Sequence, residues 1–172
     1  MLFRGNFSTL SFQLLQDIDV PNFSFSSKLP VPAEQVLATL NMVGVNAELY
    51  PLVKMTAPNS FAERSVLGWP QRQQLFKSWV LLFGIVPIDH HSFYFDTINP
   101  EEGFSESSSS ATNASWCHER KITPQPTGCC VIDTVSYKSR LPLIDVILKP
   151  AYELVFWRRH QNLRSKYGGG AA

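Results

Sequence analysis

The chain has 172 residues, of which 44% are hydrophobic and 17% charged, a composition typical of one globular domain. Its formal net charge is only +1, so the chain lacks the basic excess that is typical of nucleic-acid-binding proteins. We therefore expect no nucleic-acid partner. The three cysteines are odd in number and two are adjacent, a pattern that favours a reducing compartment over a disulfide framework.

Residues 1–21 show no clean hydrophobic period, and we expect them to form a loosely attached leader. They lack the unbroken apolar core and the small-residue cleavage site of a signal peptide. The sequence contains no run of the ~18 apolar residues that a transmembrane helix needs. We therefore predict a cytoplasmic protein without a transmembrane segment, and the sequence leaves its oligomeric state open.

The first part of the chain predicts one strand and then two short helices. Residues 23–29 alternate between apolar and polar side chains, which is typical of a half-buried strand. Apolar residues then recur at helical spacing, and prolines end each segment. The predicted elements that follow are helices over 33–40 and 44–50, a short strand over 52–56, and an irregular segment over 58–74.

From residue 75 onward the sequence is rich in β-forming residues separated by short turn signals. This spacing predicts an antiparallel meander. The run Ser105–Ser110 is low in complexity, but we interpret it as part of a strand because hydroxyl residues tolerate extended geometry. The predicted strands cover residues 79–83, 91–99, 104–122 and 129–140.

A period of about 3.6 residues predicts a long amphipathic helix over 143–167, with a flexible tail over 168–172. Pro150 is expected to kink this helix or to mark the start of its straight part. One apolar stripe holds Ile147, Ala151, Leu154 and Val155, and the neighbouring stripe holds Tyr152, Phe156, His160 and Leu163. The C-terminal half of this helix is rich in cations, namely Arg158, Arg159, Arg164 and Lys166. This pattern is typical of a solvated helix end, and a weak contact with a membrane surface is the alternative.

Residues 122–131 predict a hairpin with a testable register. A four-residue loop over 125–128 pairs Ile122 with Val131 and, further along, Arg120 with Asp133. Because side chains alternate between the faces of a sheet, one face then receives Trp116, His118, Arg120, Ile122, Val131, Asp133, Val135 and Tyr137.

Four segments carry a family resemblance, namely residues 25–36, 116–120, 132–137 and 156–163. They resemble the START-like, or SRPBCC, ligand-binding superfamily, which includes polyketide cyclases, lipid-transfer START domains and plant pathogenesis-related allergens. The resemblance covers residues 22–167 and implies a single α+β helix-grip domain. In this fold a curved antiparallel sheet wraps around a long C-terminal helix and leaves a cavity between them. The chain departs from the pattern in the irregular segment 58–74 and in the polar strand 105–110.

Such a cavity suits a small apolar or amphipathic molecule, such as a lipid, an isoprenoid or a polyketide-like ring. We predict that binding or transport of this ligand is the function. The predicted ligand-binding residues are Trp79, Phe93, Phe95, Trp116, His118, Arg120, Asp133, Val135, Tyr137, Ala151, Leu154 and Val155. Val36, Leu40 and Ile147 are expected beside them in the core.

Alternatives remain open for these residues. Arg120 and Asp133 would serve either as ligand contacts or as a structural pair that neutralises two buried charges, and His118 either as a core residue or as a ligand contact. A cyclase- or aromatase-like enzyme acting in the same cavity is the alternative function, although no nucleophile–base motif occurs and no catalytic residue is assigned. A third hypothesis is a protein-interaction module with a filled interior.

Metal binding is not expected. The adjacent pairs His90–His91 and Cys129–Cys130 would point to opposite faces of a strand, and neither has the spacing of a zinc site. No phosphate-binding loop occurs either, so we expect no cofactor.

Overall fold

The computed structural model describes residues 20–172, and within them one curved antiparallel sheet contains eight strands in the order β2-β3-β4-β5-β6-β7-β1-β8. The predicted leader thus lies outside the described residues except for its last two positions, and the division into leader, domain and tail stays a prediction. The strands are β1 (Asn22–Leu29), β2 (Val53–Met55), β3 (Gln74–Leu82), β4 (Val86–Asn99), β5 (Gly103–Ser110), β6 (Asn113–Gln125), β7 (Gly128–Ser139) and β8 (Gly170–Ala171).

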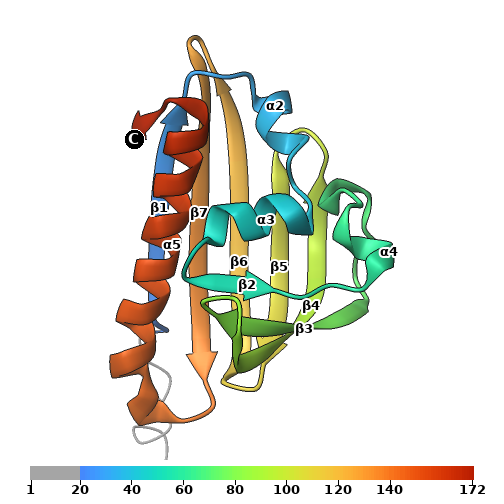
Figure 1. Cartoon of the computed structure of the whole chain (residues 1–172), viewed down its shortest axis with the longest axis vertical. Helices are drawn as coiled ribbons and strands as arrows, with labels where there is room; N and C mark the ends of the chain where they lie inside the picture. Colours follow the sequence, from blue (N-terminus) through green and yellow to red (C-terminus); the bar gives the residue numbers. More distant parts are fainter. Residues whose placement is uncertain (1–19) are drawn as a thin grey trace, which may run out of the picture.

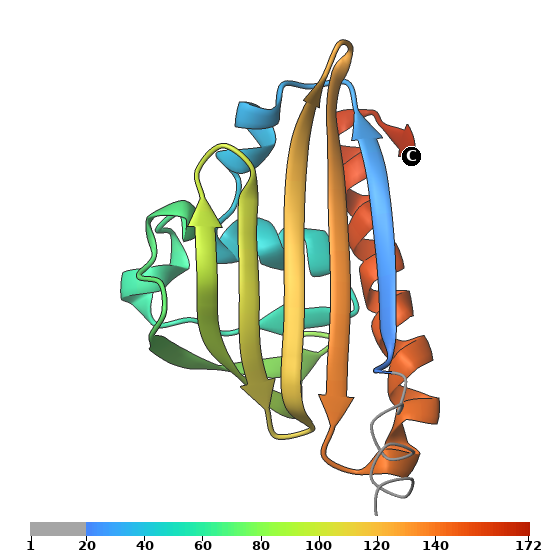
Figure 2. The same cartoon turned by 180° about the vertical axis from the view of Figure 1, so that it is seen from behind.

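The helices of the described residues lie on one side of this sheet. The long C-terminal helix α5 runs beside β1 and β7, and α2 and α3 lie on the same side (Figure 1). Seen from behind, the strands form the near layer, and no helix of residues 20–172 covers them (Figure 2). The described helices are α2 (Ala33–Leu37), α3 (Met42–Leu49), α4 (Asn59–Ala62) and α5 (Asp145–Tyr167), with 3₁₀ turns η1 (Val66–Gly68) and η2 (Pro142–Ile144). The predicted α+β helix-grip fold, with two short helices after the first strand, is confirmed.

The single strand predicted over residues 104–122 is wrong, because the chain turns at Ala111 and Thr112 between β5 and β6. The turn is held by Asp89 of β4, whose carboxylate accepts hydrogen bonds from both backbone amides, at 2.9 and 3.3 Å. This partner lies more than twenty residues earlier in the chain. A local pattern of hydroxyl residues therefore gives no sign of the turn, although the strand predicted over Ser105–Ser110 is confirmed.

The predicted hairpin register is confirmed, since Ile122 pairs with Val131 and Arg120 with Asp133. Its turn is tighter than predicted, because residues 125 and 128 also pair. Gly128 has a φ of +139°, and a Cβ on it would lie 2.0 Å from the carbonyl oxygen of Leu29 at the end of β1. Glycine is therefore required where β1 passes the β6–β7 turn.

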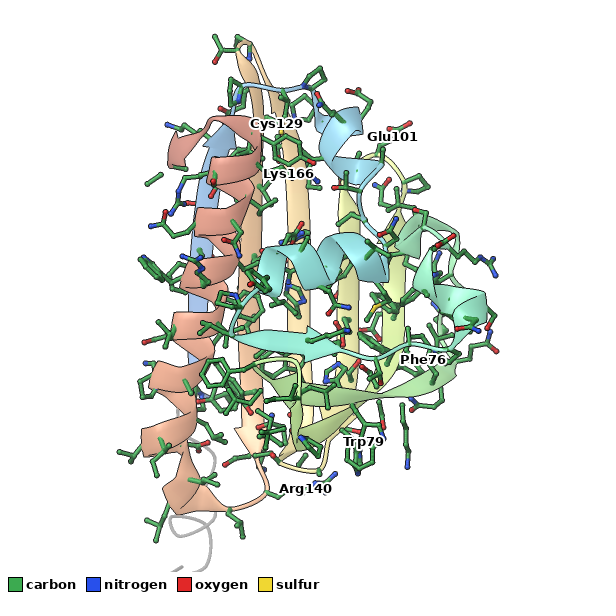
Figure 3. All side chains as sticks on the ribbon, in the orientation of Figure 1. Phe76, Trp79, Glu101, Cys129, Arg140 and Lys166 are labelled. Atoms are coloured by element: carbon green, nitrogen blue, oxygen red, sulfur yellow. The ribbon has the colours of Figure 1, made fainter. Side chains whose placement is uncertain are left out.

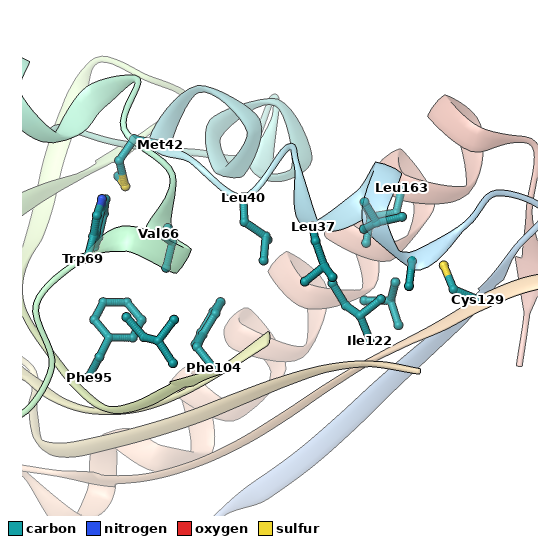
Figure 4. Packing of buried hydrophobic residues seen from close by; sticks show 14 of the residues in the cluster. Leu37, Leu40, Met42, Val66, Trp69, Phe95, Phe104, Ile122, Cys129 and Leu163 are labelled. Atoms are coloured by element: carbon teal, nitrogen blue, oxygen red, sulfur yellow. The ribbon is translucent and has the colours of Figure 1, made fainter. Parts of the chain in front are cut away.

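A large apolar cluster fills the space between α2, the start of α3 and the sheet. Figure 4 shows Leu37 and Leu40 pointing toward strand residues such as Phe104 and Ile122. The irregular segment over 58–74 belongs to this core, because it contributes Trp69, which is only 3% exposed. The fully buried members of the cluster include Leu29, Val36, Leu37, Leu40, Val66, Trp69, Phe93, Phe95, Phe104, Ile122, Val131 and Leu163.

The long C-terminal helix continues through Pro150 and ends at the glycines. Pro150 lies inside α5, six residues along a helix that is unbroken from Asp145 to Tyr167. Gly168 ends the helix in the left-handed conformation, and the residues predicted to form a flexible tail include β8, which pairs with β1 at Ser27 and Lys28.

Candidate functional site

The centre of the interior holds an ionic cluster around Arg120, which is 1% exposed. Its guanidinium donates from Nε and Nη2 to the two carboxylate oxygens of Asp133, at 2.8 and 2.7 Å, and from Nη1 to Glu48 at 2.8 Å. Glu48 also accepts a hydrogen bond from Nε of Arg159 at 2.7 Å. Because these four residues come from β6, β7, α3 and α5, the ionic cluster ties both helices to the sheet.

Two histidines complete the hydrogen bonding of Asp133. His118 Nε2 lies 2.8 Å from Oδ1 and His160 Nε2 lies 3.0 Å from Oδ2. With the two bonds from Arg120, each carboxylate oxygen has two partners, which uses its acceptor capacity. The other ring nitrogen of His160 lies 2.8 Å from Oγ of Ser27 on β1. The cluster therefore also fixes α5 against β1.

Glu106 of β5 extends the ionic cluster toward β4. Its carboxylate is hydrogen bonded to His91 Nε2, and its second oxygen lies 3.7 Å from His118 Nδ1. Burial raises the pKa of this carboxyl, but the facing charges of His91 and His118 and the hydrogen bond from His91 outweigh burial and lower the pKa to about 2. Glu106 is therefore ionised across the physiological range.

For the carboxylates around Arg120 as well, nearby positive charge outweighs the effect of burial on the pKa. Burial raises the pKa of Asp133 and of Glu48, yet the positive charges of Arg120 and Arg159 hold both pKa values below the usual range. These charges are paired and their hydrogen-bonding groups are engaged with one another. The arrangement favours the structural role of the Arg120–Asp133 pair over a direct ligand contact.

An aromatic cluster lies where β7 ends and α5 begins. The ring of Tyr152 packs edge-on against Trp116 and against Tyr137, with both centroid separations at 5.0 Å. The ring of Phe156 stands between this group and His118, 5.2 Å from the imidazole. The cluster comprises Phe23, Phe25, Trp116, Val135, Tyr137, Leu148, Tyr152 and Phe156.

Two buried polar atoms in and beside this aromatic cluster have no partner. The hydroxyl of Tyr137, a residue that is 1% exposed, makes no hydrogen bond to any residue within 20–172. Asn113 donates from Nδ2 to the Tyr152 hydroxyl at 2.7 Å, but its carbonyl oxygen is likewise unpartnered in the described chain. A buried polar atom normally has a partner because losing water without replacement costs free energy. Within residues 20–172, His90 Nδ1 and Asp145 Oδ1 are the other buried side-chain atoms without a partner, so these two atoms are among four polar groups left available.

The Tyr137 hydroxyl is available as a neutral group. Burial, reinforced by the negative charge of Asp145 at the start of α5, raises the pKa of Tyr137 to about 12. At neutral pH the phenol therefore keeps its proton and offers both a donor and an acceptor.

The two described pockets lie outside this interior. One has a volume of about 240 Å³ and opens on the uncovered face of the sheet, where Ser107, Ser109 and Cys117 line it beside Tyr94. The other, of about 210 Å³, lies beside the β6–β7 turn and the end of α5. Among residues 20–172, no group of three or more His, Cys, Asp or Glu side chains has an arrangement that would hold a metal ion.

Comparison with known families identifies the chain. Residues 27–167 match the model of a domain of unknown function, DUF8410. The chain belongs to this family. Among curated proteins, none matches the sequence of this DUF8410 chain.

Solved structures share its fold at low sequence identity. Protein CV1439 from Chromobacterium violaceum is 13% identical with a TM-score of 0.65, covering 85% of the DUF8410 chain and 96% of its own. A START superfamily protein from Mycobacterium smegmatis is 7% identical with a TM-score of 0.56, covering 86% and 97%. Major latex-like protein 151 from Panax ginseng is 6% identical with a TM-score of 0.57, also covering 86% and 97%. The fold of the DUF8410 chain is therefore START-like, as the sequence resemblance implies.

The structure brings together half of the predicted ligand-binding residues. Those on β6 and β7 share the concave face, as the hairpin register predicts. Phe93 and Phe95 instead belong to the large apolar cluster, where both rings pack against Trp69 with centroids 6.0 and 5.7 Å apart. The residues that the concave face brings together are Trp116, His118, Arg120, Asp133, Val135 and Tyr137.

The prediction that the Ile147–Val155 stripe of α5 faces the core is wrong. Ile147 is 69% exposed, Leu154 is 52% exposed and Ala151 is exposed, whereas Val155 is half-buried. The neighbouring stripe faces inward because its polar member His160, and Arg159 directly before it in the sequence, find partners on α3 and the sheet. Trp79, also predicted to line the cavity, is 54% exposed on β3.

Sequence reasoning missed several members of the ionic cluster. Glu48 lies on a short helix that gives no amphipathic signal, and Glu106 lies within the serine run. Arg159 was expected on a solvated helix end, but it is 4% exposed. One signal was available, since Glu106 follows Phe104 by two residues and therefore points to the same face of the strand as the core.

Proposed function

We propose that the DUF8410 chain binds a small apolar or amphipathic molecule at the aromatic cluster, between the sheet and the N-terminal half of α5. The observation that carries the proposal is the Tyr137 hydroxyl, buried among rings and without a partner in the described residues. Small-molecule sites in proteins are mostly apolar and hold a few polar groups that orient the ligand. The Tyr137 hydroxyl and the Asn113 carbonyl would be those groups.

The regions next to the aromatic cluster support placing the ligand site there. The ionic cluster and the large apolar cluster also lie between the helices and the sheet, and their described polar groups are largely engaged with one another. Trp116 and Tyr152 are half-buried, so rings of the aromatic cluster meet solvent, as Phe61 and Phe76 do beside the large apolar cluster. The aromatic cluster differs in its buried Tyr137 hydroxyl, which has no partner among the described residues. A molecule with an apolar body and one hydroxyl, carbonyl or amide group would pack against these rings and satisfy the Tyr137 hydroxyl.

The first test identifies what the protein carries. Native mass spectrometry of the purified full-length chain, followed by denaturation and analysis of the released material, is expected to show a bound apolar molecule in part of the population. The second test titrates the apolar dye anilinonaphthalene sulfonate, which is expected to bind at one site and to be displaced by a lipid extract.

Two tryptophan variants locate the dye. Trp116→Ala removes a wall of the proposed site and is expected to weaken dye binding about tenfold, because a large buried ring contact is lost. Trp79→Ala removes a tryptophan that is 54% exposed and lies outside the aromatic cluster, so it serves as the matched control. Equal affinities of the two variants, or no saturable dye site in the parent chain, would favour a protein-interaction module with a filled interior.

A further inference from the structure

Large apolar side chains are exposed on two protrusions of the described chain. The hairpin tip, defined as residues 83–88, comprises the turn between β3 and β4 and the first three residues of β4. In it Phe83 is 61% exposed and Ile85 is 78% exposed. The connection, defined as residues 141–147, comprises the end of the link from β7, the 3₁₀ turn η2 and the first three residues of α5. In it Leu143 is 90% exposed and Val146 is 79% exposed. Single exposed apolar residues are ordinary, but groups of them on a hairpin tip and on an interelement connection mark an interaction surface.

Both protrusions adjoin the same end of the sheet. The carboxylate of Asp89, one residue beyond the hairpin tip, holds the β5–β6 turn at Ala111 and Thr112. The backbone amide of Arg140, which directly precedes the connection, donates a hydrogen bond to the carbonyl of Thr112 at 2.9 Å. Figure 3 shows Trp79 of β3 and Arg140 at this end of the molecule.

The backbone at the hairpin tip is left-handed at two successive residues, the first of which is not glycine. Phe83 has a φ of +52° and is followed by Gly84 at +77°. Bulky side chains rarely occupy this left-handed region, where asparagine and glycine are favoured. A phenylalanine that is both strained and 61% exposed contributes little to the core, and such outliers point to function.

Exposed cations flank the two protrusions. Lys54 lies beside the hairpin tip, with its Cβ 3.8 Å from the position that a Cβ on Gly84 would take, and Lys54, Arg140 and Lys149 are all exposed. The acidic residues nearby are half-buried, and Asp89 among them is engaged with the β5–β6 turn. This end of the sheet therefore has exposed apolar side chains with exposed cationic side chains beside them.

We propose that the hairpin tip and the connection dock together on an anionic lipid surface. The apolar side chains enter the boundary between headgroups and acyl chains, and Lys54, Arg140 and Lys149 bind the negative headgroups. A lipid surface is deformable, so both protrusions can enter it at the same time. A symmetric dimer through the same face would bring each cation toward the cations of the second copy, so charge favours the lipid surface over self-association.

This surface differs from the membrane contact expected from the basic end of α5. There Arg159 is bonded to Glu48, and Arg164 donates to the Ser27 hydroxyl at 2.8 Å, so both cations serve the interior. The docking surface also does not include the unpartnered atoms of the aromatic cluster. Dye binding and vesicle binding are therefore separable properties of the chain.

The test uses sedimentation of the full-length chain with phosphatidylcholine vesicles and with mixed phosphatidylcholine–phosphatidylserine vesicles. The chain is expected to bind the mixed vesicles more tightly, and added salt is expected to weaken this binding because it screens the cations. Absence of binding to the mixed vesicles, or equal binding to both kinds, would overturn the proposal.

Phe83→Asn separates docking from folding. Asparagine tolerates the left-handed conformation, so this variant is expected to unfold at a temperature equal to or above that of the parent chain. It is expected to bind mixed vesicles about tenfold more weakly, because a large apolar side chain no longer enters the lipid. The matched control is Val43→Asn on α3, at a residue that is 60% exposed, and it is expected to bind as the parent does.

Two further readouts decide between this proposal and others. Trp116→Ala is expected to weaken dye binding about tenfold and to keep vesicle binding, so failure of the ligand site would leave docking intact. Light scattering of the chain in solution tests the second copy as the occupant. A dimer that Phe83→Asn converts to a monomer would assign the surface to self-association and overturn the lipid proposal, as would unchanged vesicle binding by Phe83→Asn.

Discussion

The large apolar cluster and the aromatic cluster lie on the same concave face and are both rich in rings, yet they differ in their polar surroundings. Around the large apolar cluster, Phe93, Phe95 and Trp69 pack against one another, and the Trp69 indole donates to the carbonyl of Arg64 at 3.2 Å. In the aromatic cluster the Tyr137 hydroxyl has no such partner among the described residues. The difference indicates that the first region is scaffold and that the second has unused binding capacity.

The ionic cluster separates these two regions, and its loss should have the largest effect. Asp133→Ala would leave Arg120, His118 and His160 without their shared partner in a buried site. We expect the free energy of unfolding to fall by about 3–5 kcal/mol, measured by urea denaturation. Glu119→Ala, which removes an exposed carboxylate from the other face of β6, should change it by less than about 0.5 kcal/mol. Similar losses in the two variants would contradict the central role of Asp133.

Two leucines of α5 test which face of the helix belongs to the scaffold. Leu163→Ala removes a side chain that is 1% exposed in the large apolar cluster, and it should cost about 2–5 kcal/mol of unfolding free energy. Leu154→Ala removes one that is 52% exposed and should cost about 0.5 kcal/mol or less. Thermal unfolding of both variants measures the contrast, and a larger loss for Leu154→Ala would restore the stripe predicted from sequence.

Acid should weaken the ionic cluster before it affects the apolar contacts. The pKa of Glu106 is about 2 in the folded chain against an ordinary 4.5, so folding favours the ionised form. The resulting stability is fully present above pH 4.5 and is lost as the pH falls toward 2, by on the order of 3 kcal/mol. Urea denaturation between these pH values measures the slope, which Glu106→Gln should flatten. An unchanged slope in that variant would assign the acid sensitivity to other carboxylates.

The variant with the smallest expected effect on stability, Tyr137→Phe, tests most sharply whether the aromatic cluster differs from the large apolar cluster. Tyr137→Phe removes the unpartnered hydroxyl but keeps the ring, so the free energy of unfolding should change by no more than about 0.5 kcal/mol. Chemical denaturation measures it. A loss well beyond this would mean that the hydroxyl is already satisfied within the protein, and the aromatic cluster would then be scaffold as well.

The sequence predicted the fold well where its patterns are local or pairwise. Alternation identified β1, and the hairpin pattern placed Arg120 opposite Asp133, because the register follows from a turn and a period of two. It did not predict which stripe of α5 faces inward, because both stripes are apolar and only Arg159 and His160 distinguish them. Their partners, Glu48 and Ser27, lie more than a hundred residues away, and no local pattern links them.

The central claim is that the aromatic cluster binds a ligand and the large apolar cluster does not. Aromatic carbon–proton NMR spectra of the full-length chain, recorded during titration with anilinonaphthalene sulfonate, report on both regions at once. We predict saturable shifts for the rings of Trp116, Tyr137 and Tyr152, with the rings of Trp69 and Phe95 unchanged. Shifts confined to Trp69 and Phe95, or to Tyr94 in the pocket on the uncovered face, would contradict the claim.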